Sequence, residues 1–110
     1  MKLDVEALAS QMLAAALPIL QKDAQDAAEF AKTEFTKIAQ TIVSIGEQLV
    51  AGQINQQQAG LLLDMQTSAS RNVLLTLKGL ALLAVEAAIN AALNVIKTVV
   101  NTAVGISLIP

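Results

Sequence analysis

Residues 61–104 constrain the fold most, because this stretch is apolar on nearly every side of the helix that it predicts. At 100° per residue, its polar side chains fall within roughly a quarter-turn of one another. This polar stripe comprises Ser68, Glu86, Asn90, Lys97 and Asn101. Because its phase is kept throughout, we predict one continuous helix over about residues 56–104, bent at Gly60 and Gly79. A helix with so narrow a polar face must be buried in protein or in lipid.

Alanines form a ridge of small side chains on the other side of this predicted helix. Ala84, Ala88 and Ala92 recur every four residues, a spacing that lets another helix approach closely. The alternative is that alanine is present only as a strong helix former. We predict that the ridge and the polar stripe together form an interface between chains, with the residues Ala81, Ala84, Ala88, Ala91, Ala92, Glu86, Asn90, Asn94, Lys97 and Asn101.

The same stretch has the length of a membrane span, but its charges argue against spanning. Lys78, Glu86 and Lys97 interrupt it, and the uncharged run 87–96 is too short to cross a bilayer. The chain contains no Trp and no Tyr, so it lacks the aromatic residues that mark membrane interfaces. Membrane association is therefore the alternative to burial in protein.

Composition favours self-association. The chain of 110 residues corresponds to a single domain. Its residues are 55% hydrophobic and only 15% charged, against about a quarter charged in average proteins, and its mean hydropathy is +0.58. A domain this small has much surface for its volume and buries apolar side chains inefficiently. We therefore expect a homo-oligomer.

Two helices are predicted before the long one. Asp4 can cap a helix over about residues 5–17, and Pro18 should kink or end it. A second helix should follow over about residues 19–51. Its apolar positions are spaced alternately by four and three residues, as in a heptad repeat, and are Ala24, Ala28, Ala31, Phe35, Ile38, Ile42, Ile45 and Leu49. Its opposite face carries charged residues, including Glu34 and Lys37, and should meet water.

Gly52 should end the second helix, and residues 52–55 should form a short turn between antiparallel helices. Asn55 followed by Gln58 matches a capping box at the start of the next helix. Residues 105–110 are expected to be a non-helical or frayed apolar tail, available to dock onto a neighbouring subunit.

The residue types present argue against catalysis. The chain has no His, Cys, Tyr or Trp, which removes most general acids, nucleophile–base pairs and common metal ligands. We therefore predict no enzyme activity, no catalytic residue, no cofactor and no metal site. Asp23, Asp26 and Glu29 could hold a cation weakly, but a solvated acidic face is the expected interpretation. The chain has one Arg, six Lys and a net charge of −2, so we do not expect it to bind nucleic acid. No small-molecule substrate is evident from the sequence.

The predicted fold class is all-α, with a short N-terminal helix and a long antiparallel helical hairpin that assembles into an oligomeric bundle. The expected function is that of a non-enzymatic structural or assembly protein, such as a component of a filament or virion. A membrane-active helical hairpin that inserts into bilayers is the alternative. A third hypothesis is a carrier of an apolar ligand held between Leu- and Ala-lined helices. The sequence indicates no cellular compartment.

Overall fold

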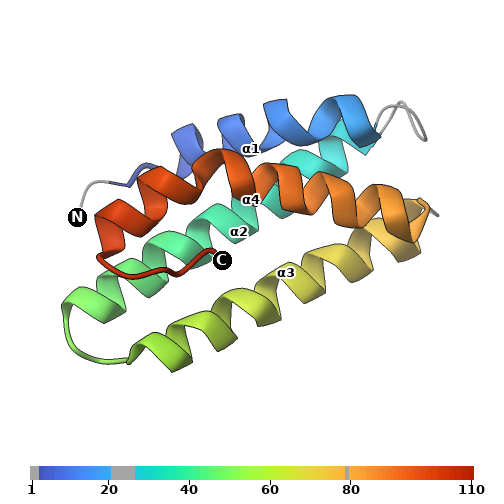
Figure 1. Cartoon of the computed structure of the whole chain (residues 1–110). Coiled ribbons are helices and arrows are strands. Elements are labelled where there is room, and N and C mark those ends of the chain that lie inside the picture. The colour runs from blue at the N-terminus through green and yellow to red at the C-terminus, as the bar shows by residue number, and fades with distance from the viewer. Residues whose placement is uncertain (1–2, 21–26, 79) are drawn as a thin grey trace.

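The computed structural model describes residues 3–20, 27–78 and 80–110, and these residues form four helices and no strand. The helices are α1 (Val5–Leu20), α2 (Ala27–Val50), α3 (Gln56–Lys78) and α4 (Leu82–Val104). They run alternately up and down a bundle that measures 41 × 21 × 19 Å (Figure 1). The all-α fold class is confirmed over the described residues.

Side chains cap the first and third helices as the sequence predicts. The backbone N–H of Glu6 donates to Asp4 Oδ1 at 3.2 Å, which satisfies a donor in the first turn of α1. At the start of α3 the capping box is reciprocal. The Gln58 N–H donates to Asn55 Oδ1 at 2.8 Å, and the Asn55 N–H donates to Gln58 Oε1 at 2.9 Å.

The turn between α2 and α3 depends on a left-handed glycine. Gly52 has a φ of 72°, and its N–H donates to the Leu49 carbonyl at 3.1 Å. The Gln53 N–H donates to the Gln48 carbonyl at 2.9 Å. This pair of hydrogen bonds is the Schellman motif, which satisfies carbonyls at a helix end and reverses the chain. The prediction that α2 ends at Gly52 is confirmed.

The prediction of one continuous helix over residues 56–104 is wrong. Helix α3 ends at Lys78, and α4 begins at Leu82 after Ala81, whose backbone is extended (φ −64°, ψ 140°). A continuous helix of that length would be about 70 Å long and would leave the apolar face of its second half without neighbours. Folding back brings α4 onto α1 and α2 instead. Gly79, where a bend was predicted, lies outside the described residues.

Helix α1 also differs from its predicted bounds. It continues through Pro18 to Leu20, rather than ending at about residue 17. Pro18 is exposed near the end of the helix, and continuation buries Leu20 completely, which offsets the disruption by the proline ring. Residues 19 and 20 belong to α1, so the second helix does not begin at residue 19, and its described part runs from Ala27. Asp23 and Asp26, the first two members of the weak cation cluster, lie outside the described residues.

Helices α1, α2 and α4 contribute most of the core, and α3 adds Ala59, Leu63 and Leu74. Helix α1 packs mainly on α4 and α2, whereas α3 packs on α2, touches α4 less and does not contact α1 within the described parts. The predicted apolar face of α2 is buried at Ala31, Phe35, Ile38, Ile42 and Ile45, and half-buried at Ala28 and Leu49, whereas Ala24 lies outside the described residues.

The accessible surface shows how much the chain buries by itself. It is 6036 Å², close to the roughly 5,800 Å² expected for a compact monomer of this mass. The radius of gyration is 13.5 Å, against about 13 Å expected. The chain is therefore as compact as a monomer of its mass and buries a core of its own. Self-association remains a prediction, and it depends on particular exposed side chains rather than on a missing core.

Polar side chains hold part of α3 against α2. Thr41 Oγ1 donates to Gln66 Oε1 at 3.3 Å, and Gln66 Nε2 donates to Oγ of the fully buried Ser70 at 3.2 Å. Glu34, which the sequence placed on the water-facing side of its helix, is only 3% exposed and pairs with Lys37 at 3.0 Å. The prediction that Glu34 meets water is therefore wrong. The helix that covers this face of α2 is α3, which the heptad pattern of α2 alone does not reveal.

Candidate ligand groove between α3 and α4

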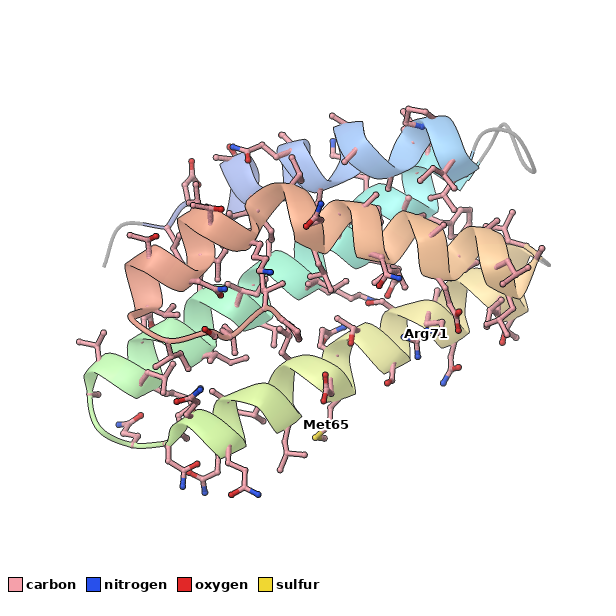
Figure 2. The ribbon with its side chains drawn as sticks, in the orientation of Figure 1. Met65 and Arg71 are labelled. Carbon is pink, nitrogen blue, oxygen red and sulfur yellow. The ribbon has the colours of Figure 1, made fainter. Side chains whose placement is uncertain are left out.

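A groove of about 540 Å³ lies between α3 and α4. Helix α3 contributes one wall, including Arg71 in its C-terminal half (Figure 2). Helix α4 contributes the other wall, and the C-terminal segment closes one side. The lining residues are Leu63, Asp64, Thr67, Arg71, Ile89, Asn90, Ala91, Leu93, Asn94, Ile109 and Pro110.

The C-terminal segment folds back because of two local features. Gly105 has a φ of 79°, and its N–H donates to the Asn101 carbonyl at 3.0 Å, which ends α4 in a left-handed cap. The Asn101 side chain then makes two hydrogen bonds with Ile109. Its Nδ2 donates to the Ile109 carbonyl, and its Oδ1 accepts from the Ile109 N–H, both at 2.9 Å.

These contacts bury the apolar end of the chain within its own bundle. Leu108 is 5% exposed and Ile109 is 2% exposed. The segment is non-helical, as predicted, but it is not frayed and is not free to dock onto a neighbouring subunit. Asn101, which is also predicted at an interface between chains, holds this segment in place.

Removing the Asn101 side chain should destabilise the fold measurably. We expect Asn101→Ala to lower the free energy of unfolding by about 1–2 kcal/mol, because both backbone groups of the buried Ile109 lose their partner. Urea unfolding followed by circular dichroism measures the change. Thr102→Ala, at the next and exposed position, is the control and should change stability by less than about 0.5 kcal/mol. Equal losses would mean that the Asn101 contacts contribute nothing.

The polar lining of the groove centres on Arg71. Its Nε is buried and has no hydrogen-bond partner among the described residues. Thr67 is 7% exposed and donates back to the Asp64 carbonyl at 3.1 Å, so its hydroxyl hydrogen is already used. Asn90 and Asn94 are exposed on the opposite wall. A permanently charged guanidinium beside amide groups suits recognition of an acceptor group rather than proton transfer.

Sequence reasoning found one wall of this groove and missed the other. Asn90 and Asn94 were predicted as interface residues, whereas Asp64, Thr67 and Arg71 were not recognised as a group. A signal was present: positions i, i+3 and i+7 lie on one side of a helix. What the spacing could not show was that α4 folds back to face them.

The remaining predicted interface residues are divided between the inside and the outside of the bundle. Ala88 and Ala92 are completely buried within the chain, on a helix that packs most extensively against α1. These two alanines of the ridge therefore pack against other helices of the same chain. Of the others, Ala81 is exposed, and the half-buried residues are Ala84, Glu86, Ala91 and Lys97.

The groove thus combines one buried cationic donor, polar groups on both walls and an apolar floor. Comparison with protein-family models, with curated proteins and with solved structures found no match to this chain.

Proposed function

We propose that this protein is a non-enzymatic assembly protein that forms a homo-oligomer through an outer face of α4. The face, called here the α4 outer stripe, consists of Ala84, Ala87, Ala91, Val95 and Val99. Successive members are three or four residues apart, so they follow one side of the helix. None of the five is buried within the chain.

The observation that carries the proposal is how little of α4 its own chain covers. Only 33% of the most apolar 18-residue window of this helix is buried. Val95 is 47% exposed and Val99 is 53% exposed, although both are large apolar residues. Burying such side chains against a second copy removes apolar surface from water, which favours association.

The shape of the stripe also suits helix packing. Its first part is made of alanines, which let a second helix approach closely, and its second part presents two valines that can fill the space between helices. Arg71 and the other polar groups of the groove wall on α3 would remain outside the core of such an interface.

Substitution of the two valines tests the proposal. We expect the unmodified chain to show an oligomeric mass by light scattering in detergent-free buffer. Val95→Gln/Val99→Gln should shift that mass toward the 11.5 kDa of one chain, because polar side chains then replace the apolar contact.

Val50→Gln is the matched control. Val50 is 69% exposed at the end of α2, far from the stripe in sequence, and its substitution should leave the oligomer intact. A monomer at high concentration for the unmodified chain, or an unchanged mass for the double variant, would contradict the proposal.

A membrane-active role is the second candidate, and one observation favours it. Among the described helices, α4 is the one that is long and apolar enough to cross a membrane, although core helices of soluble proteins pass the same test. In that role, α4 would leave α1 and insert into lipid. Dye release from liposomes on addition of the protein would support insertion, and intact liposomes across the pH range would count against it.

A further inference from the structure

We propose that the groove between α3 and α4 binds an amphiphilic carboxylate, with the carboxylate at Arg71 and the hydrocarbon part on the apolar floor. The ligand class is that of medium-chain fatty acids. This site adjoins the assembly face proposed above and shares Ala91 with it, but its cationic group lies on α3 rather than on the α4 outer stripe.

The first argument is the state of the Arg71 side chain. A buried donor without a partner costs about 1–3 kcal/mol, so native proteins rarely leave one unsatisfied. Arg71 Nε is such a donor among the described residues. The guanidinium offers planar donors that match both oxygens of a carboxylate. Arg71 also lines the groove, so a carboxylate bound there would supply a compensating charge for the guanidinium.

The charge in the groove is not neutralised locally. Asp64 also lines the groove, but it precedes Arg71 by seven residues on the same helix, which is about 10 Å along the axis. No ion pair joins the two side chains among the described residues. At that separation, about one Debye length at moderate ionic strength, Asp64 repels a bound carboxylate only weakly.

The second argument is the apolar part of the groove. Leu63 from α3, Ile89 and Leu93 from α4, and Ile109 from the C-terminal segment all line it. Its volume of about 540 Å³ falls within the range of about 300–1,000 Å³ that is typical of small-molecule sites. A few polar groups on an apolar surface fix the orientation of a ligand whose body is hydrocarbon.

A second groove of similar size shows why the Arg71 site is preferred. It lies between α2 and α3, has a volume of about 520 Å³, and includes the exposed Met65 (Figure 2). Its cation, Lys37, already pairs with Glu34 at 3.0 Å. A carboxylate there would have to compete with a carboxylate of the protein, whereas Arg71 forms no ion pair among the described residues.

Three probes of equal chain length test the proposal on the unmodified protein. Octanoate, octanol and octylamine share a hydrocarbon tail and differ in the head group. We expect octanoate to bind at least about tenfold more tightly than either of the others, measured by calorimetry below the concentrations at which they form micelles. Amide NMR signals of Asn90 and Asn94 should shift with octanoate. Equal affinity for octanol would overturn the proposal, because the guanidinium would then play no part.

Variants locate the site. Arg71→Gln should weaken octanoate binding by about tenfold or more, while Arg71→Lys, which keeps the charge but loses the planar fork, should have a smaller effect. Lys32→Gln removes the same charge from an exposed position on α2 and should leave binding unchanged. An equal loss of octanoate affinity in Lys32→Gln would mean that net charge alone determines binding, and it would refute a site at Arg71. If Arg71→Gln fails to fold, the relative affinities of octanoate, octanol and octylamine for the unmodified protein still test the proposal.

Discussion

Phe35→Ala should lower the free energy of unfolding by about 3–5 kcal/mol. Phe35 is completely buried in the middle of the apolar face of α2, in line with the fully buried Ile38 and Ile42. Removal of the ring takes away its transfer free energy and leaves a cavity that the surrounding helices fill only in part. Because helices α1, α2 and α4 share this core, the loss should appear in global unfolding rather than in the fraying of one helix.

Urea unfolding followed by far-ultraviolet circular dichroism measures this loss, at a fixed protein concentration since an oligomer makes stability concentration-dependent. Phe30→Ala makes the same chemical change at the other phenylalanine of the chain, which is 38% exposed. It should cost less than about 1 kcal/mol. Similar losses for the two variants would remove Phe35 from the centre of the core.

Ala88→Leu should cost about 1–3 kcal/mol for the opposite reason. Ala88 is completely buried on α4, together with Ala92 one turn later. A larger side chain at a closely packed seam forces neighbouring helices apart or into strained rotamers. The destabilisation should persist at protein concentrations low enough to favour single chains, because the contact lies within one chain.

Ala69→Leu is the matched control, since Ala69 is exposed on α3. Its effect on the free energy of unfolding should stay within about 0.5 kcal/mol. If Ala88→Leu instead altered only the oligomeric mass, and left unfolding at low concentration unchanged, then the original prediction of an interface between chains at Ala88 would be right. The buried position of Ala88 in a single chain would then not describe the protein in solution.

Signals that act over a few residues were predicted correctly. The cap at Asp4, the capping box of Asn55 and Gln58, and the end of α2 at Gly52 are each set by hydrogen bonds and dihedral angles within one turn. The buried face of α2 was predicted as well, because an apolar stripe at helical spacing identifies a face that avoids water whichever helix covers it.

The candidate site was predicted in part. Asn90 and Asn94 were singled out as members of a polar stripe, but their partner across the groove was not. The sequence shows Arg71 as the one arginine of the chain but does not indicate that it lines a groove. A cationic group becomes part of a site when other elements surround it, and the elements that surround Arg71 come from α4 and the C-terminal segment.

The sequence by itself determined that the chain is helical, where several helices begin and end, and which face of α2 is apolar. Only the tertiary structure decided that residues 56–104 form two helices, that Leu108 and Ile109 are buried against the bundle, and that Ala88 and Ala92 pack within one chain. The physical reason is that periodicity records which side of each helix is polar, and does not record whether the residues between two helices are themselves helical. The polar stripe keeps its phase from α3 to α4 although Ala81 between them is extended, so the phase alone did not establish one continuous helix. Caps and periodicity act within a helix, whereas the choice between a long exposed helix and two folded ones depends on the apolar surface that α1 and α2 offer to α4.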